Sequence, residues 1–440
     1  MKIGFVSLGC SKNLVDTEVM LKRLADAGYT ITPDETEADI IVVNTCGFIQ
    51  SAKEEAIDNI LDVAWLKKNR ALKGIIATGC LVERYREQVL EEMPEVDAVL
   101  GTGSYHKIVE AVEAVARGEK YASFEDKNAA PLGGERIVTT PPYTAYLKVA
   151  EGCDNRCTYC AIPLIRGRMR SRRMEDVVAE AKSLEKIGVK ELNIIAQDTS
   201  RYGLDLYGKY MLPELVQKIL AETQIPWIRL LYLYPDKITD ELVAVIRDND
   251  RVCKYVDLPI QHVNDTVLAR MNRHGDGAVV RAAVEKIRRE IPGVTLRTTA
   301  IVSFPGETEA QFAELCEFVK ETGFDRFGAF TYSPEEGTPA AEFPDQIDEQ
   351  VKQDRYDTLM AVQLEVSEKK MKEKIGDVIE VLCEGYDPVA GVQYGRSRAD
   401  APDVDGKVYF TSAKKLPEGV FVNVKITKAL DYDLFGEAVR

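Results

Sequence analysis

The sequence predicts an α/β protein with three domains: a parallel sheet, a central partial (β/α)6 barrel and a small antiparallel β-barrel. The first two domains follow from short apolar runs that alternate with helical patterns up to about residue 345. The third follows from strand-like runs separated by Gly, Pro and Asp after residue 374. A chain of 440 residues can bury several cores, so more than one domain is expected.

The N-terminal domain is expected to span residues 1–125. Its apolar runs are Lys2 to Leu8, Asp39 to Asn44, Gly74 to Thr78 and Val96 to Leu100. Segments between these runs, such as 16–27 and 52–69, carry apolar residues at helical spacing. Because this alternation joins parallel strands through helices, it predicts a parallel sheet covered on both faces.

A linker and a barrel are expected next. Residues 126–142 lack periodicity and are rich in Gly, Pro and polar residues, which is typical of a linker. Residues 143–345 contain six strand-like runs, each followed by a helix-like segment, which predicts an incomplete (β/α) barrel. These runs are Ala145 to Ala150, Glu191 to Ala196, Trp227 to Tyr232, Tyr255 to Pro259, Thr295 to Val302 and Arg326 to Phe330.

The C-terminal part changes character twice. Residues 346–374 are polar and mostly helical in pattern, so they predict a helical connector. Residues 375–440 predict the small antiparallel barrel from the runs Val378 to Cys383, Gly406 to Phe410 and Phe421 to Ile426.

Composition limits the partners and the compartment. A net charge of -15 repels nucleic-acid phosphates, so a basic protein partner is at least as plausible as RNA. No apolar run reaches the roughly 18 residues that cross a bilayer, and MKIGFVSLGC is typical of a strand rather than a signal peptide. We therefore expect a cytoplasmic protein without a membrane partner. In that compartment nine cysteines favour metal binding or catalysis over disulfides.

The strongest motif is the Cys-x-x-x-Cys-x-x-Cys loop of Cys153, Cys157 and Cys160, just after the first barrel strand. Three thiolates on one short loop can hold three corners of a 4Fe-4S cluster and leave the fourth iron open. A zinc knuckle or buried core cysteines are the alternatives. Zinc usually takes a fourth Cys or His, and none follows before Cys253. The spacing resembles the radical S-adenosylmethionine superfamily, which implies that the cosubstrate fills the open position.

A second set of cysteines, Cys10, Cys46 and Cys80, ends three predicted strands of the N-terminal sheet. The carboxyl ends of such strands form one ligand crevice, so the three thiols are expected to converge and bind metal. Helices begin soon after each cysteine and should favour the thiolate. The alternative is that one or two of them are small buried hydrophobic residues. The remaining cysteines are expected to serve packing only: Cys253, Cys316 and Cys383.

With both sets placed, the chain resembles the methylthiotransferase family, and most closely its branch that modifies an aspartate of a small-subunit ribosomal protein at the decoding centre. The resemblance spans nearly the whole chain and implies a flavodoxin-like N-terminal domain, a radical barrel and a C-terminal TRAM domain. The matching stretches are SLGCSKNLVDTE, EGCDNRCTYCAIPLIRGRMRSR, AQDTSRYG, IVSFPGET and DLPIQH. Relatives that modify transfer RNA usually have Gln-Met-Asn after the first cysteine, where this chain has Ser11-Lys12-Asn13. The segment Asn272 to Asp276 departs from the family pattern and has no predicted role.

The resemblance also implies the chemistry. The cluster on Cys153 would cleave S-adenosylmethionine reductively, and the resulting radical would abstract hydrogen from the β-carbon of the target aspartate. A second 4Fe-4S cluster, on Cys10, Cys46 and Cys80, would deliver a methylthio group made with another S-adenosylmethionine. The expected partners are the ribosomal protein, an electron donor such as flavodoxin or ferredoxin, a sulfur source and ribosomal RNA.

Other polar residues are candidates for binding. Tyr159 in the cysteine loop, and Gln197 and Asp198 at the end of a barrel strand, are expected to contact S-adenosylmethionine or the substrate, unless the last two only cap the strand. Five arginines after the loop either hold an anion or form a solvated basic face: Arg166, Arg168, Arg170, Arg172 and Arg173.

Two other functions are considered. A transfer-RNA methylthiotransferase would use the C-terminal barrel to bind RNA, yet residues 375–440 hold 11 acidic residues against 8 lysines and arginines. A non-catalytic iron-sulfur electron carrier would leave the cysteine spacing and the barrel unexplained. It also predicts no 5'-deoxyadenosine.

Overall fold

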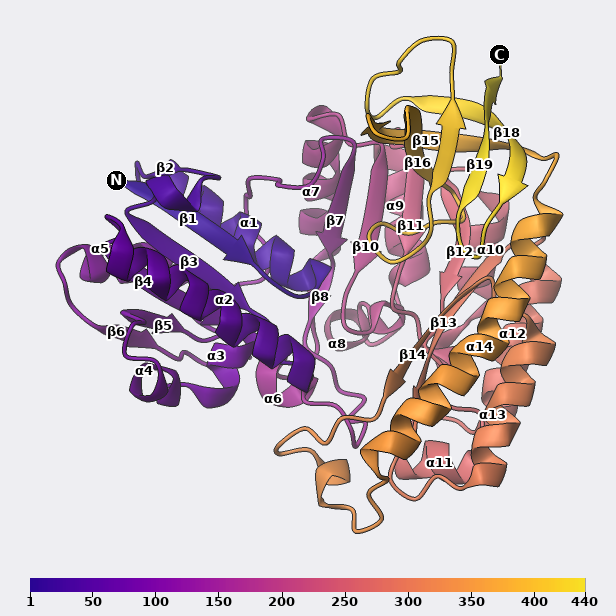
Figure 1. Ribbon diagram of the computed structural model, residues 1–440, viewed down its shortest axis with the longest axis horizontal. Helices are drawn as coiled ribbons and strands as arrows, with labels where there is room; N and C mark the ends of the chain where they lie inside the picture. The colour runs from indigo at the N-terminus through magenta and orange to yellow at the C-terminus, as the bar shows by residue number, and fades with distance from the viewer. Residues whose placement is uncertain (440) are drawn as a thin grey trace.

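A six-stranded parallel sheet forms the first body of the computed structural model, which describes residues 1–439 and leaves the final residue of the predicted C-terminal domain, Arg440, outside the described part. The strand order is β2-β1-β3-β4-β5-β6 (Figure 1). The strands are β1 (Lys2–Ser7), β2 (Thr30–Ile31), β3 (Ile40–Thr45), β4 (Gly74–Gly79), β5 (Ala98–Leu100) and β6 (Tyr121–Ser123). The sequence prediction missed the short edge strands β2 and β6.

Helices cover both faces of this sheet, as predicted. One face packs against α1 (Ser11–Asp26) and α5 (Ile108–Ala116). The other packs against α2 (Gln50–Asn69), α3 (Cys80–Tyr85) and α4 (Gln88–Glu92). Since β3 and β4 lie between two apolar layers, every residue of both strands is buried.

The central body is an open parallel sheet in the order β14-β13-β12-β11-β10-β7, which confirms the partial (β/α)6 barrel. Its strands are β7 (Thr144–Lys148), β10 (Glu191–Ile195), β11 (Trp227–Leu230), β12 (Val252–Asp257), β13 (Thr295–Val302) and β14 (Arg326–Thr331). The longer helices are α7 (Met174–Lys186), α9 (Leu212–Glu222), α10 (Asp240–Asp248), α12 (Gly277–Glu290) and α13 (Glu309–Thr322). Shorter elements are α6 (Ile162–Arg166), α8 (Leu204–Tyr207), α11 (Asp265–Arg270) and the antiparallel pair of β8 (Ala150–Glu151) and β9 (Arg170–Ser171).

A long helix and a closed barrel complete the chain. Helix α14 (Glu349–Glu373) runs beside α13 and β14 (Figure 1). The barrel order is β15-β16-β17-β19-β18, with antiparallel pairs except for the parallel pair β17 and β19. Its strands are β15 (Val378–Asp387), β16 (Val392–Ser397), β17 (Val408–Thr411), β18 (Phe421–Ala429) and β19 (Leu434–Val439). None of the helices within residues 1–439 combines the length and apolarity needed to span a membrane.

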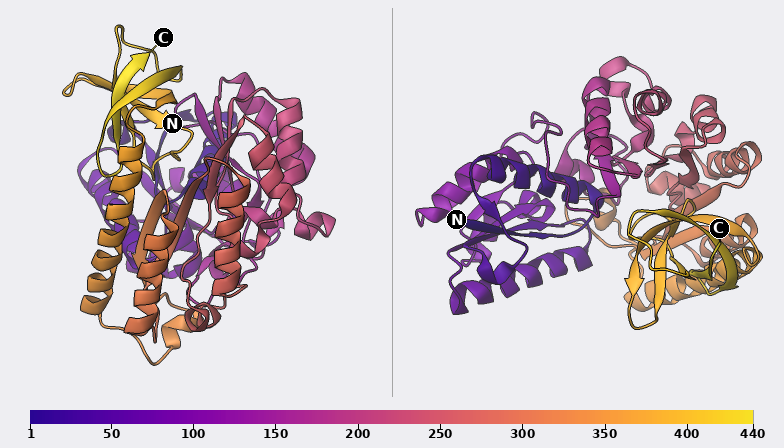
Figure 2. Two further views of the ribbon diagram at one scale, coloured as in Figure 1. Left: turned by 90° about the vertical axis from the view of Figure 1, so that its right-hand side faces the viewer. Right: turned by 90° about the horizontal axis from the view of Figure 1, so that it is seen from above.

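The C-terminal barrel sits on the amino ends of the central strands (Figure 2). Glu191, the first residue of β10, accepts hydrogen bonds from Arg229 at 3.0 Å and from Arg396 of β16 at 2.5 Å. Burial alone would raise the pKa of Glu191, but Arg396 and Arg229 outweigh it and lower that pKa to about 2. The carboxylate therefore stays ionised and joins the two bodies.

Replacing Glu191 with alanine is expected to lower the free energy of unfolding by about 3 to 5 kcal/mol, because the buried guanidinium group of Arg229 loses its carboxylate and that of Arg396 keeps only Glu384. Urea unfolding measures the loss. Glu368→Ala removes an exposed helix pair with Lys372 and should cost less than about 1 kcal/mol. Because the pKa of Glu191 falls from 4.5 to about 2 on folding, its contribution is complete above pH 4.5 and is lost as the pH falls towards 2. Equal free energies of unfolding for Glu191→Ala and Glu368→Ala would contradict this role of Glu191.

Candidate active site between the two parallel sheets

The loop of Cys153, Cys157 and Cys160 leaves the carboxyl end of β7 through the β8 hairpin strand. Gly152 makes this exit possible, because its φ is 78° and a Cβ atom there would lie 2.1 Å from the carbonyl oxygen of Arg168. Cys157 is buried, and the other two thiols are partly exposed. The loop thus presents its sulfurs at the end of the barrel where such folds place their chemistry.

The segment Asn272 to Asp276, which had no predicted role, holds this loop. Asn272, with a φ of 51°, donates through its side-chain amide to the carbonyl of Arg156 at 2.9 Å. Arg273 lies over the ring of Tyr234 at 3.9 Å from the centroid and donates to the carbonyl of Pro259 at 2.6 Å. The Tyr234 hydroxyl in turn lies 3.4 Å from Cys157 Sγ. The segment therefore fixes the cysteine loop from one side.

The structure brings the three N-terminal cysteines together at one edge of the first sheet. A Cβ atom on Gly9, next to Cys10, would lie 2.8 Å from the Cβ of Cys46. A Cβ atom on Gly47, next to Cys46, would lie 2.9 Å from the carbonyl carbon of Cys80. The two glycines thus let the three cysteine-bearing turns touch, as the strand pattern predicted.

Burial decides the protonation of these thiols in the absence of metal. It raises the pKa of Cys80 to about 12 and that of Cys153 to about 12, and it also raises the pKa of Cys46 and of Cys160. The pKa of Cys46 and of Cys80 is therefore raised, against the prediction that both would favour the thiolate, because burial outweighs the backbone N–H of Phe48 at Cys46 and the charge of Arg166 at both. A bound metal would reverse this balance, since a coordinating thiol is deprotonated outright.

The donor sets suit an extended cluster. Among residues 1–439, no three His, Cys, Asp or Glu side chains form a group that could hold a metal ion. An iron-sulfur cluster spreads its ligands over separate iron atoms, so its thiolates need not converge on one point. Each set supplies three thiols, and this number leaves one corner of a four-iron cluster free for another ligand.

Four buried charges join the two sheets. Asp16 of α1 pairs with Lys148 of β7 and, at 2.5 Å, with Arg166 of α6. Glu151 pairs with Lys148 at 2.7 Å and with Arg166 at 3.3 Å. Burial would raise the pKa of Glu151, but Lys148 and Arg166 lower it to about 2. This charge quartet is neutral, and Arg166 also donates to Cys80 Sγ at 3.4 Å.

The five arginines do not form one surface. Arg166 is only 3% exposed and pairs within the quartet rather than facing an open site. Arg172 is buried against Glu180 at 2.6 Å, and Arg170 donates to the carbonyl of Ala130. The remaining two are exposed: Arg168 and Arg173. The predicted common anion site and the predicted solvated face are therefore both wrong for the group as a whole, because intervening residues turn the side chains apart.

The other candidates lie around the same space. Gln197 donates to Glu151 at 2.6 Å, and its carbonyl oxygen is buried without a hydrogen-bond partner among residues 1–439. Asp198 is fully engaged, since it accepts from Asn155 of the cysteine loop at 2.7 Å and from Ser200 at 2.5 Å. Burial raises the pKa of Asp198. Gln197 thus has an acceptor to offer to a ligand.

Tyr159 lies close to Arg273, whose guanidinium group also lies over the ring of Tyr234. Its hydroxyl is 3.5 Å from Arg273, and its ring meets Phe304 edge-on at 6.5 Å between centroids. Burial raises its pKa well above the ordinary value, so the hydroxyl stays protonated. It is therefore a neutral hydrogen-bond donor beside Cys157 and Cys160.

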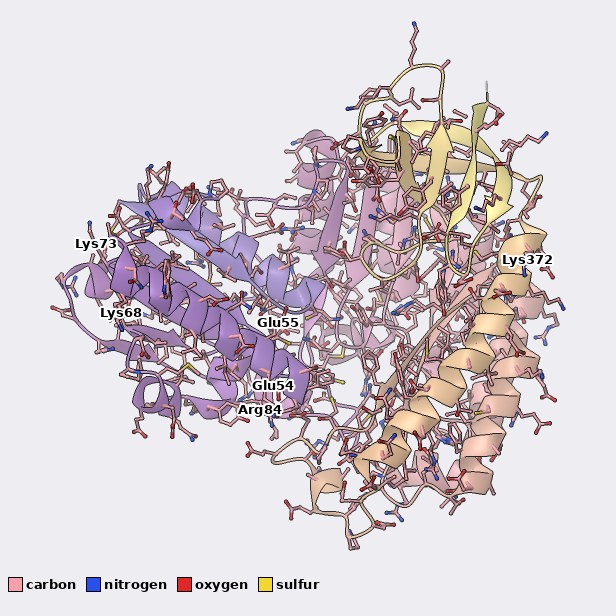
Figure 3. The ribbon with its side chains drawn as sticks, in the orientation of Figure 1. Glu54, Glu55, Lys68, Lys73, Arg84 and Lys372 are labelled. Carbon is pink, nitrogen blue, oxygen red and sulfur yellow. The ribbon has the colours of Figure 1, made fainter. Side chains whose placement is uncertain are left out.

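A second contact ties the N-terminal domain to the barrel. Glu335, in the segment after β14, accepts from Arg84 of α3 at 2.6 Å and from Lys53 of α2 at 3.2 Å. Figure 3 shows Arg84 at the edge of the N-terminal domain beside this segment. All three side chains are nearly buried, so the contact helps to close the space beside Cys46 and Cys80.

Sequence reasoning missed several of these residues. Lys148, Glu151 and Arg273 each have a partner far away in the chain, namely Asp16, Gln197 and Tyr159, and no local spacing reveals such pairs. Lys12 was noticed only because the resemblance marks the Ser11-Lys12-Asn13 difference. Lys12 is only 7% exposed although it lies close to a candidate metal ligand, and this burial marks it as a functional candidate only once the fold is known.

Three family models match the chain in the order of its three bodies. The uncharacterized protein family UPF0004 matches residues 2–101, the radical SAM superfamily matches residues 147–319, and the TRAM domain matches residues 375–439. With the cysteine loop at the carboxyl end of a parallel barrel strand, they define a radical S-adenosylmethionine enzyme. Such an enzyme uses an iron-sulfur cluster and S-adenosylmethionine.

Full-length relatives give the particular family. The ribosomal protein uS12 methylthiotransferase RimO of Thermoanaerobacter sp. is 50% identical over 436 residues, covering 99% of both chains. That of Desulforamulus reducens is 50% identical over 441 residues, covering 100% of this chain and 99% of the relative. The chain therefore belongs to the RimO family of ribosomal protein uS12 methylthiotransferases, which confirms the predicted branch. These relatives favour neither the transfer-RNA enzyme nor the electron carrier.

The fold also has distant likenesses among solved structures. The radical S-adenosylmethionine methyltransferase TsrM from Kitasatospora setae, solved with cobalamin and a 4Fe-4S cluster, matches with a TM-score of 0.56. It is 14% identical and the match covers 77% of this chain and 76% of that chain. At this identity the likeness concerns the fold alone.

Proposed function

We propose that this methylthiotransferase adds a methylthio group to the β-carbon of an aspartate in ribosomal protein uS12, using two 4Fe-4S clusters. The carrying observation is the opposition of two sets of three thiols across one buried interface, where Arg166 of the barrel reaches Cys80 of the other domain at 3.4 Å. The names of the full-length relatives support the substrate. Cys153, Cys157 and Cys160 would hold one cluster, and Cys10, Cys46 and Cys80 the other.

When bound, the cluster of the barrel and S-adenosylmethionine supply a radical that abstracts hydrogen, and the other cluster supplies the methylthio group. The protein's residues keep these reactants together. The charge quartet and the contacts of Glu335 hold the two domains so that the acceptor carbon and the sulfur share one enclosed space. Tyr159 and Gln197 would position the cosubstrate or the substrate, while Asp198 would orient the cysteine loop through Asn155.

The proposal divides the chain by task. Residues 1–125 would carry the sulfur-donating cluster, 126–142 would link the domains, and 143–345 would carry the radical chemistry. Residues 346–374 would connect to the TRAM domain at 375–440. The reaction also requires an electron donor such as flavodoxin or ferredoxin and a source of sulfur. Because the substrate is a ribosomal protein, the site of action would be the cytoplasm.

A contact with ribosomal RNA is supported by the outer face of the C-terminal barrel. Tyr394, Tyr409 and Phe435 lie side by side on β16, β17 and β19, with centroid separations of 6.3 and 5.1 Å. Lys407 lies over Tyr394 at 4.6 Å, and Lys428 pairs with Phe435 across the strands. Partly exposed rings flanked by lysines can stack with bases despite the negative charge of the whole domain.

A direct assay tests the proposed function. Anaerobic enzyme rebuilt with iron and sulfide is incubated with reductant, S-adenosylmethionine and either uS12 or transfer RNA, and mass spectrometry follows both. We expect a gain equal to one methylthio group on uS12, at the target aspartate, together with 5'-deoxyadenosine. Modification of transfer RNA alone would contradict the proposal, and so would 5'-deoxyadenosine that forms without any modified uS12.

A further inference from the structure

Lys12 is a largely buried lysine close to the N-terminal cysteines. It is the second residue of α1, follows Cys10 by two positions and is only 7% exposed. Its Nζ lies 3.0 Å from the centroid of the Tyr232 ring. Within residues 1–439 the amine makes no hydrogen bond and no ion pair. The aromatic face covers one side of the ammonium group, so its remaining hydrogens are left to donate elsewhere.

The two cations of the charge quartet are compensated. Lys148 and Arg166 face two carboxylates, those of Asp16 and Glu151, so the charge quartet adds no net charge. Lys12 therefore brings one positive charge that no carboxylate of the described residues balances. Burying a charge without a partner is costly, and such residues cluster where a ligand completes the site.

Tyr232 holds this charge against the barrel, two residues before Tyr234. Its φ of 62° is rare for a large side chain, and the backbone is held by Asp257, which accepts from its N–H at 2.9 Å, and by Thr199, which donates to its carbonyl at 2.9 Å. Two residues further on, the hydroxyl of Tyr234 lies 3.4 Å from Cys157 Sγ. The segment from Tyr232 to Tyr234 thus contacts both Lys12, two residues after Cys10, and Cys157 of the cysteine loop.

We infer that Lys12 binds the side-chain carboxylate of the target aspartate. The inference rests on the proposed function and names the group that selects an acidic substrate side chain. The β-carbon of an aspartate is bonded directly to its carboxyl carbon. A salt bridge from Lys12 to the carboxylate therefore also fixes the position of the β-carbon, which is the carbon that reacts. This carbon would then lie near both the sulfur donor and the cysteine loop.

The test compares the binding of two labelled peptides from the uS12 target loop, one with the native aspartate and one with asparagine at that position. Fluorescence anisotropy is measured anaerobically with cluster-loaded enzyme. Wild type should bind the aspartate peptide about 10 to 100 times more tightly than the asparagine peptide. Lys12→Met should lose this preference by weakening the aspartate peptide alone, and Lys12→Arg should largely restore it.

Lys73→Met is the matched control. Lys73 belongs to the same domain, is 60% exposed and lies at the outer end away from the barrel (Figure 3). This variant should bind both peptides as wild type does. Lys12→Met should also keep the wild-type iron content, because all six candidate cluster cysteines are unchanged.

Two results would overturn the inference. Lys12→Met could bind both peptides as wild type does, or it could weaken both equally while changing the electron paramagnetic resonance spectrum, which would make Lys12 a counter-ion of the cluster. Either result alongside a wild-type enzyme that modifies uS12 contradicts the inference alone. A wild-type enzyme that leaves uS12 unmodified contradicts the proposed function, and the inference with it.

Discussion

Replacing Cys153 with alanine is expected to lower the formation of 5'-deoxyadenosine from S-adenosylmethionine by at least about 100-fold. Residues that merely support metal ligands already cost 10- to 100-fold when changed, and Cys153 would be a ligand itself. The loop offers three thiols, so the loss of Cys153 would leave two irons of the proposed cluster without a protein ligand. Chromatography of anaerobic reactions with dithionite measures the product.

Cys316→Ala is the control for this prediction. Cys316 lies in α13, is partly exposed and packs against the barrel core, away from both cysteine sets. It should retain the rate of the parent enzyme. Equal rates of 5'-deoxyadenosine formation in Cys153→Ala and Cys316→Ala would show that the radical chemistry does not depend on the Cys153 loop.

Cys46→Ala is expected to separate the two halves of the reaction. This variant should still form 5'-deoxyadenosine, because the barrel cysteines are intact, but should transfer no measurable methylthio group to uS12. Its iron content should fall to about half of the parent value, since one of the two proposed clusters would be lost. Intact-mass analysis of uS12 and an iron assay on the same samples give both results.

Cys383→Ala provides the comparison. Cys383 is buried in the C-terminal barrel core and should affect neither iron nor transfer. If Cys46→Ala continued to modify uS12 at the parent rate, the N-terminal set would not be the sulfur donor. If Cys46→Ala also failed to form 5'-deoxyadenosine, cleavage of S-adenosylmethionine would depend on both cysteine sets.

Local pattern was enough to predict the layers of the fold. The run before Cys80 is apolar, ends in glycine and is followed by a helical pattern. These features together predict a buried parallel strand. Edge strands such as β2 and β6 have two and three residues, and their apolar signal is too short to detect. The parallel pairing of β17 with β19 depends on how the barrel closes rather than on the composition of either strand.

The site was predictable only where its residues are adjacent in sequence. The spacing of Cys153, Cys157 and Cys160 identifies the radical loop by itself. Arg166 is predicted either to hold an anion or to lie on a solvated basic face, but its partners Asp16 and Cys80 lie 150 and 86 positions away, and no window of sequence contains them. Contacts of this range are set by domain packing, which sequence periodicity does not encode.

The anchoring of Glu191 has a consequence for the making of the protein. Its partner Arg396 lies 205 positions later in the chain. At about 5 to 20 residues per second, roughly 10 to 40 seconds of translation separate them. Throughout that interval Glu191 has only one of its two guanidinium partners, so we expect a chain that ends before β16 to be digested by proteases more easily than the full chain.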